Sequence, residues 1–173
     1  MQADLLDVLT RLASANNIRC MRVTPPFDGL DQFDYGLRKA LDPYFDWQEF
    51  GSLLLQSTPP NTLLFAEGTF ELQFALFRIP DEENAVFMIG PWATAERSEK
   101  SRSWARRHIG EKGDDAVQSY YNGVRILSGS GFQASIVAVV SMMFPQEEFH
   151  LDQQKEFLPF HFTTDLRYFT EPE

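Results

Sequence analysis

Hydrophobic and polar positions alternate strictly in the middle of the chain. Between Phe70 and Leu76 every second residue is apolar, whereas most residues between them are not. This period of two predicts a half-buried β-strand, because successive side chains of a strand point to opposite faces of the sheet. A polar, acidic turn at 80–84 separates this strand from a second apolar run, Ala85 to Ile89. With a further run at Thr62 to Ala66, the pattern predicts a three-stranded antiparallel meander.

Before the meander, apolar residues recur every three or four positions, which is the spacing of one helix face. This pattern predicts helices at 4–15 and 30–42, with a short strand at 18–24 between them. A third helix is expected after Asp46, because Glu49 stands three residues later, as in a capping box. That helix is expected to end before Pro59-Pro60.

After the meander, the segment 93–109 is rich in charged residues and predicts a solvent-facing helix. A short helix is expected at 114–121 and an extended piece at 124–127. The helix predicted from Phe132 to Met143 is apolar on nearly all sides, so we expect it to be central in the fold. Residues 146–173 show no clear period.

These elements predict an α+β fold of the GAF or PAS-like kind. We expect an antiparallel sheet of four to six strands with helices on both sides. A chain of 173 residues is long enough for one domain with a sizeable core. The expected domain covers residues 1–145, and residues 146–173 form a C-terminal tail.

The formal net charge of −10 argues against direct binding to nucleic acid or to anionic membranes, since both require clustered Lys and Arg. Cys20 is the single cysteine of the sequence, which excludes an internal disulfide and suits a reducing compartment. No run approaches 18 apolar residues, and the first residues do not resemble a signal peptide. We therefore expect a cytoplasmic protein.

Several polar features are candidate sites, and each also has a structural explanation. The stretch Ser128–Gly131 before a helix suits an anion, but Ser130 is also a common N-cap residue. Cys20 has no helper base near it in the sequence, which favours a buried apolar role. The residues Asp81–Glu83 are either a catalytic carboxylate cluster or a solvated turn. No metal site is expected, because the histidines lack partners at ligand spacing: His108, His150 and His161.

The aromatic content of 14% is a further feature of the composition. Aromatic residues on a sheet can line an apolar cavity for a small molecule, and they can equally form an ordinary core. The ligand-binding candidates are an apolar wall of Phe70, Phe87 and Trp92 with the polar groups Glu71, Gln73 and Tyr120. If no helix covers their face of the sheet, Glu71 and Gln73 simply face water.

Short motifs in this chain resemble the N-terminal sensor domains of AraC-type helix-turn-helix transcriptional regulators of Gram-positive gut bacteria. The resemblance rests on an aromatic strand followed by Arg78-Ile79-Pro80, an acidic turn, and the sequence Met88-Ile89-Gly90-Pro91-Trp92. It continues through Tyr120-Tyr121 to the apolar helix that ends at Phe144. The chain departs from the family pattern at Gly68, where Asp is frequent, and at Arg125, where Pro is frequent.

The resemblance implies a ligand-sensing and dimer-forming domain that binds an unknown small-molecule effector without turnover and without a cofactor. It implies a homodimer that contacts DNA only through a C-terminal helix-turn-helix region absent from this chain. Two alternatives stay open. One is a pure dimerisation module with no ligand. The other is a small enzyme acting on an apolar substrate, although no nucleophile or acid–base pair stands at a recognisable spacing.

Overall fold

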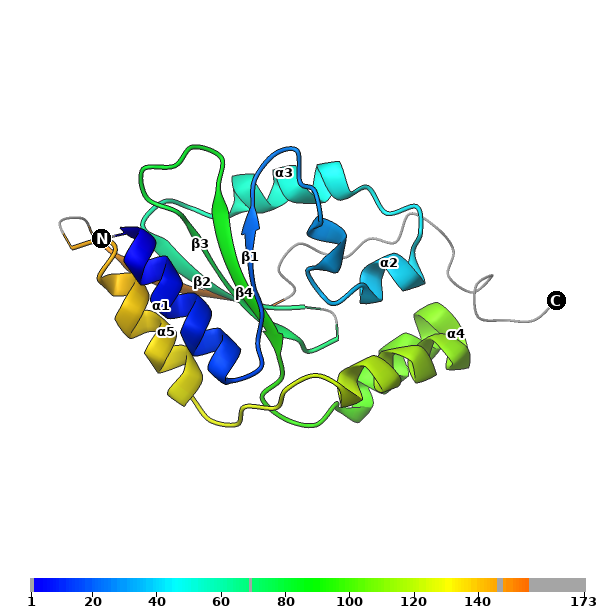
Figure 1. The fold of residues 1–173 in the computed structure, drawn as a ribbon. Coiled ribbons are helices and arrows are strands. Elements are labelled where there is room, and N and C mark those ends of the chain that lie inside the picture. Colours follow the sequence, from blue (N-terminus) through cyan, green and yellow to red (C-terminus); the bar gives the residue numbers. More distant parts are fainter. Residues whose placement is uncertain (1, 69, 146–147, 156–173) are drawn as a thin grey trace.

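The computed structural model describes residues 2–68, 70–145 and 148–155. Its core is one five-stranded sheet in the order β1-β4-β3-β2-β5, flanked by helices (Figure 1). In chain order the elements are α1 (Gln2–Ala15), β1 (Cys20–Val23), the 3-10 helix η1 (Leu30–Gln32), α2 (Leu37–Leu41), α3 (Trp47–Ser57), β2 (Thr62–Glu67), β3 (Gln73–Arg78), β4 (Val86–Trp92), α4 (Glu99–Asn122), α5 (Gly131–Ser141) and β5 (His150–Lys155). The predicted α+β class is confirmed.

The predicted meander is present as β2, β3 and β4, which pair antiparallel. The sheet as a whole is mixed, because β5 pairs parallel with β2, and the prediction of a purely antiparallel sheet is wrong there. β5 comes from a segment that shows no clear period, since its side chains at 151–153 are all exposed. An edge strand with no buried side chain at these positions leaves no alternation to read.

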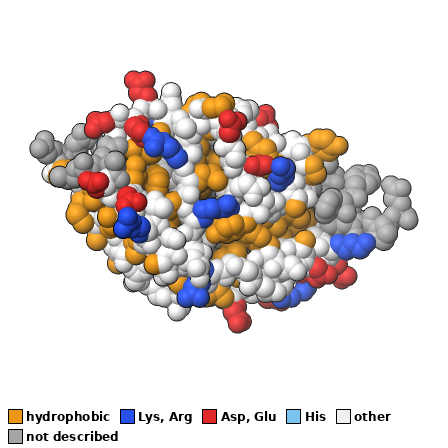
Figure 2. Space-filling view, viewed as in Figure 1, with side chains coloured by type: hydrophobic (Ala, Val, Ile, Leu, Met, Phe, Trp, Pro, Cys, Tyr) orange, Lys and Arg blue, Asp and Glu red, His pale blue; other side chains and the backbone are white. Residues whose placement is uncertain are grey.

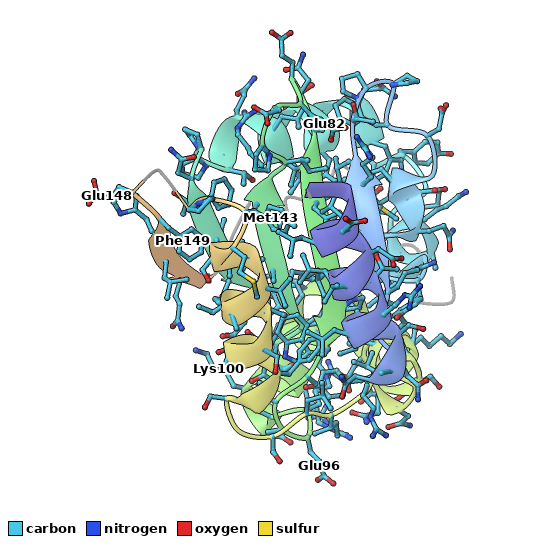
Figure 3. All side chains as sticks on the ribbon, turned by 60° about the vertical axis from the view of Figure 1, so that its left-hand side comes forward. Glu82, Glu96, Lys100, Met143, Glu148 and Phe149 are labelled. Atoms are coloured by element: carbon cyan, nitrogen blue, oxygen red, sulfur yellow. The ribbon has the colours of Figure 1, made fainter. Side chains whose placement is uncertain are left out.

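Helices cover both faces of the sheet, so the three meander strands β2, β3 and β4 are buried on both faces rather than on one. In β3, Phe74 and Leu76 pack with one core cluster, and Ala75 and Phe77 pack with the other. α1 and α5 lie side by side over one face (Figure 3), and η1, α2, α3 and α4 lie on the opposite side (Figure 1). The strict alternation at 70–76 is also longer than the part of it that forms a strand. It starts at Phe70, whereas β3 begins only at Gln73.

α5 is a cover for the sheet and not the centre of the fold. Ile136 and Val140 are fully buried against the sheet, whereas Phe132 and Met143 are half-buried and Met142 is exposed. The prediction of a central helix is therefore wrong. A helix on the outside of a three-layer domain can also be strongly apolar, because it contacts the core along one stripe.

The helix predicted at 30–42 is interrupted. Tyr35 and Gly36 both have left-handed backbone angles, with φ of 58° and 88°, so the chain turns between η1 and α2. The apolar positions keep their helical spacing because Leu30, Phe33 and Leu37 still face one core cluster. Periodicity alone therefore predicted one helix where the structure has two short ones. The start of α3 is confirmed, since the Asp46 side chain accepts a hydrogen bond from the Glu49 N–H at 3.0 Å.

α4 joins the two helices predicted at 93–109 and 114–121. It begins later than expected, at Glu99, and Gly110 breaks its regular geometry with φ of 76°. It is not simply solvent-facing, because Ala105 and Ile109 are fully buried and Arg97, just before it, is buried as well. Among the described residues, no helix is both long and apolar enough to cross a membrane.

Candidate ligand-binding site

The six residues predicted to bind a ligand lie on both faces of the sheet and do not converge on one cavity. Phe70 packs in the cluster beneath α4, with its ring 5.7 Å from that of Trp104. Phe87 and Trp92 belong to the opposite cluster, and the Trp92 ring lies 5.1 Å from Phe132 of α5. The sheet separates these two groups of aromatic side chains.

Glu71 and Gln73 have structural partners. The Glu71 carboxylate accepts hydrogen bonds from the Ser98 N–H at 2.9 Å and from the Ser98 hydroxyl at 2.8 Å. It therefore holds the N-terminus of α4, where a negative charge is favoured by the helix dipole. Gln73 is half-buried and is the sheet partner of Trp92. The alternative in which both side chains simply face water does not apply, because neither is fully exposed.

Tyr120 is the predicted residue that lies in a distinctive environment. Its ring is 6.2 Å from that of Tyr35, across the space between the η1–α2 segment and α4. Burial, and then the nearby Asp34 carboxylate, raise the pKa of the Tyr120 hydroxyl far above its ordinary value. The hydroxyl is therefore neutral at every physiological pH and can both donate and accept a hydrogen bond.

Tyr120 and three charged residues form a group that we call the inner polar cluster: Asp34, Arg38, Asp42 and Tyr120. Asp34 is 5% exposed, Arg38 1% and Asp42 0%. Asp34 Oδ2 accepts a hydrogen bond from the Arg38 backbone N–H at 3.0 Å. Burial lowers the pKa of Arg38 to about 10, against the opposing effect of the two carboxylates. Its guanidinium lies 5.3 Å above the Phe45 ring.

Two oxygens of the inner polar cluster are buried without a hydrogen-bond partner among the described residues. They are Asp34 Oδ1 and the Tyr120 hydroxyl. A buried polar atom that lacks a partner loses its hydration with nothing in exchange, at a cost of about 1–3 kcal/mol. Native proteins carry few such atoms, and each calls for an explanation such as a bound water, ion or ligand.

Aromatic side chains form an apolar wall beside the inner polar cluster. The Phe33 ring lies 4.9 Å from Phe50, 5.7 Å from Phe74 and 5.8 Å from Trp47. Phe33 directly precedes Asp34, so the buried carboxylate stands at the edge of this wall. Figure 2 shows hydrophobic side chains gathered between α2 and α4 on this face of the molecule, with Lys or Arg side chains beside them. An apolar surface with a few convergent polar groups is the usual composition of a small-molecule site.

A groove of about 370 Å³ lies beside Tyr35, whose ring neighbours that of Tyr120 in the cluster. The groove is lined by Thr10, Ser14, Asn17, Ile18, Arg19, Cys20 and Tyr35. The Arg19 guanidinium covers the Tyr35 ring at 4.3 Å and donates a hydrogen bond to the Gln32 carbonyl. Burial raises the pKa of the Cys20 thiol to about 11, so Cys20 is a neutral lining group and not a nucleophile at pH 7.

A second hollow, of about 380 Å³, lies at the end of the sheet where the β3–β4 turn meets the end of α5. Figure 3 labels Glu82 on that turn and Met143 after α5. Arg78 lines this hollow, but its guanidinium is already bonded to the carbonyls of Leu55 and Thr58. These bonds satisfy the C-terminus of α3, so Arg78 acts there as a helix cap.

The remaining polar candidates have local roles. His108 stacks on Trp104 at 4.4 Å within α4, His150 is exposed on β5, and His161 lies outside the described residues. No cluster of three or more metal-ligating side chains occurs in the described part of the chain. Ser130 occupies the N-cap position of α5, although its side chain makes no capping bond.

Sequence reasoning missed Asp34 and Arg38. Both stand inside the apolar pattern of 30–41, four residues apart, and each directly follows one of its apolar residues, Phe33 or Leu37. Charged residues at helical spacing on an apolar face are the signal that would have found them. Their significance depends on Tyr120, which lies more than 80 positions away in the sequence and meets them only in the folded chain.

The titration of Asp34 has a measurable consequence for stability. Burial raises the pKa of Asp34 to about 6 from its ordinary value of 3.8. The folded state therefore binds the proton more tightly than the unfolded state, so this stabilisation is present below pH ~4 and is lost as the pH rises through ~6. Asp34→Asn mimics the protonated form, and we expect it to exceed the wild type in unfolding free energy by up to about 3 kcal/mol at pH 7 and by little at pH 4.

Urea denaturation of both proteins at several pH values measures this difference, and the other carboxylates cancel because the two proteins share them. A difference that does not change between pH 4 and pH 7 would contradict the raised pKa of Asp34.

Comparison of the chain with protein-family models, with curated proteins and with solved structures finds no match. The fold and the geometry of the inner polar cluster are therefore the observations on which a function is proposed.

Proposed function

We propose that this chain is a ligand-sensing domain that binds a small molecule, without turnover, at the inner polar cluster. The observation that carries the proposal is the pair of buried oxygens without partners, Asp34 Oδ1 and the Tyr120 hydroxyl, beside an aromatic wall. A ligand that donates to the first and bonds to the second would remove both deficits at once. A carboxylate kept buried although burial disfavours its charge is also a common mark of a functional site.

Tyr35 is the gate of the proposed site. It is 42% exposed, it lines the outer groove, and its ring contacts that of Tyr120 behind it. Its positive φ is unusual for a bulky residue, and such strain tends to collect at functional positions. A movement of Tyr35 about the turn at Gly36 would open a path from the groove to Asp34.

The position of the site suggests how binding is transmitted. Asp34 belongs to the η1–α2 segment and Tyr120 to the last turn of α4, beyond the break at Gly110. A ligand held between them would favour one placement of the 111–122 half of α4 over others. A sensor works in this way when its ligand binds one conformation more tightly than another.

The wider role follows from the resemblance to sensor domains of AraC-type regulators. In this proposal the chain forms a homodimer in the cytoplasm and acts on DNA through a C-terminal helix-turn-helix region. The net charge of −10 supports the assignment of DNA contacts to another region. The two other functions, a dimerisation module without ligand and a small enzyme, lack an observation that favours either.

The proposal is tested by screening small metabolites for thermal stabilisation of the wild type and of three variants. We expect at least one compound to raise the melting temperature of the wild type by several degrees, because a ligand that binds only the folded state stabilises it. The shift should be lost in Asp34→Asn and in Tyr120→Phe, which removes only the hydroxyl. It should persist in Gln73→Leu, which alters a side chain away from the cluster.

Shifts that survive in both cluster variants would place the ligand elsewhere. If no compound raises the melting temperature, and the melting temperature rises only with protein concentration, the chain is a dimerisation module.

A further inference from the structure

The groove beside Tyr35 has a positively charged lining. It lies between the second half of α1, the start of β1 and the turn from η1 to α2 (Figure 1). Arg19 is one of its lining residues, and among the described residues that line it there is no Asp or Glu. The chain as a whole has a net charge of −10. A lining with a guanidinium and no carboxylate therefore attracts an anion locally, against the acidic character of the chain.

Arg19 is held in a fixed position at this groove. Its backbone carbonyl accepts a hydrogen bond from the Gly90 N–H at 3.0 Å. Its guanidinium lies over the Tyr35 ring, 4.3 Å from the ring centroid, and donates a hydrogen bond to the Gln32 carbonyl. A guanidinium that is already ordered loses little conformational entropy when it binds a further group, so Arg19 is preorganised for a ligand.

No carboxylate neutralises the charge of Arg19 within the described ranges. The neighbouring arginines Arg11 of α1 and Arg22 of β1 each form an ion pair with a carboxylate. Arg19 forms no ion pair with the described part of the chain. The bond to Gln32 uses one of the guanidinium N–H donors, and the others remain for a planar anion.

We propose that this groove binds a small monocarboxylate, with the carboxylate group on the Arg19 guanidinium. The fork of guanidinium donors matches the two oxygens of a carboxylate, and such charge-assisted hydrogen bonds are stronger than neutral ones. Ser14 and Asn17 are exposed at the same groove and bring further donors to it. No residue of the inner polar cluster lines the groove, so this inference adds a second binding site and does not depend on the proposed function.

The rest of the lining indicates the size and polarity of the ligand. Ile18, Cys20 and Tyr35 give the groove an apolar part. Its volume of about 370 Å³ is near the lower end of the range for small-molecule sites, about 300–1,000 Å³, so a short apolar body fits. A dicarboxylate or a phosphate dianion is disfavoured, because its second negative charge meets no further cation in the described lining.

Charge determines the selectivity that we expect. The primary amide of the same acid keeps its shape but has no charge, so it should bind at least ~10-fold more weakly. An amine with the same body carries the opposite charge and should not bind. Arg19→Lys keeps the positive charge but loses the planar fork, so its affinity for the carboxylate should lie between those of the wild type and Arg19→Gln.

The experiment is calorimetric titration of the chain at pH 7.5 with phenylacetate, 2-phenylacetamide, 2-phenylethylamine and phenyl phosphate, and with butyrate and butyramide. We expect at least one carboxylate to bind, and to bind more tightly than its amide. Its affinity should fall at least ~10-fold in Arg19→Gln. The affinity should be unchanged in Arg22→Gln, which makes the same substitution three residues away at a side chain that does not line the groove.

Asp34→Asn separates this site from the inner polar cluster. We expect this variant to bind the carboxylate as tightly as the wild type does, because Asp34 does not line the groove. A loss of affinity in Asp34→Asn would contradict a separate site in the groove and would support the proposed function instead. The metabolite screen decides the proposed function by itself, so either proposal can fail alone.

Three other results would overturn the inference. They are binding of neither carboxylate, equal affinity for a carboxylate and its amide, and full affinity in Arg19→Gln. Circular dichroism confirms that each variant is folded before titration. If Arg19→Gln does not fold, Arg19→Lys and the comparison of carboxylate with amide in the wild type decide the question.

Discussion

Replacing Arg97 by methionine is expected to destabilise the fold by about 3–5 kcal/mol. Arg97 and Asp114 form a buried ion pair, with 2.6 Å between Nη1 and Oδ1 and side chains only 1% and 5% exposed. Removal of one partner leaves the other charge buried without compensation, which is the costly case. Arg97 also donates to the Ser101 hydroxyl at 2.9 Å, and that bond is lost as well.

The geometry explains why this pair matters for α4. Arg97 precedes the helix, and Asp114 follows the break at Gly110. The ion pair therefore ties the second half of α4 to the start of the first. Arg106 lies 3.5 Å from the other carboxylate oxygen of Asp114 and is partly exposed, so it offers partial compensation and favours the lower end of the range.

A double-mutant cycle with Arg97→Met, Asp114→Leu and the double variant measures the effect by chemical denaturation. We expect each single variant to be strongly destabilised and the double variant to recover much of the loss, because an apolar pair of similar volume replaces a buried ion pair at little cost. Arg107→Met is the control, since Arg107 is exposed on the same helix. Additive losses in the double variant would mean that the two side chains act independently.

Truncation of Ile136 to alanine is expected to cost about 2–4 kcal/mol. Ile136 is fully buried, and it belongs to the core cluster that α5 shares with α1 and the sheet. The loss combines the transfer free energy of the removed methyl and methylene groups with the cavity that they leave. We expect this loss of unfolding free energy even though α5 is an outer helix, because the loss depends on the burial of the Ile136 side chain.

Thermal and urea unfolding of Ile136→Ala and of Met142→Ala provide the measurement. Met142 follows α5 and is 53% exposed, so its truncation should change the unfolding free energy by less than about 0.5 kcal/mol. An unchanged midpoint for Ile136→Ala would show that α5 is not packed on the sheet as described.

The meander and the helix positions were predictable from the sequence because they depend on local periodicity. The runs at 62–66 and 85–89 coincide closely with β2 and β4, and Asp46 caps α3 as expected. The candidate site was predictable only in part. Tyr120 was named among the six candidates, but Asp34 and Arg38 were hidden within an apolar helical pattern. The other five candidates were chosen from the meander, where both faces of the sheet turned out to be covered.

Local sequence was sufficient for the strands of the meander, the Asp46 cap of α3 and the apolar faces, since each of these depends on residues a few positions apart. Three features depended on contacts between distant segments. They are the parallel pairing of β5 with β2, the covering of both sheet faces, and the meeting of Asp34 with Tyr120. Burial of a carboxylate is a property of everything packed around it. The burial of Asp34 beside Tyr120, and with it the proposed ligand site, therefore arises only when η1, α2 and α4 are assembled on the sheet.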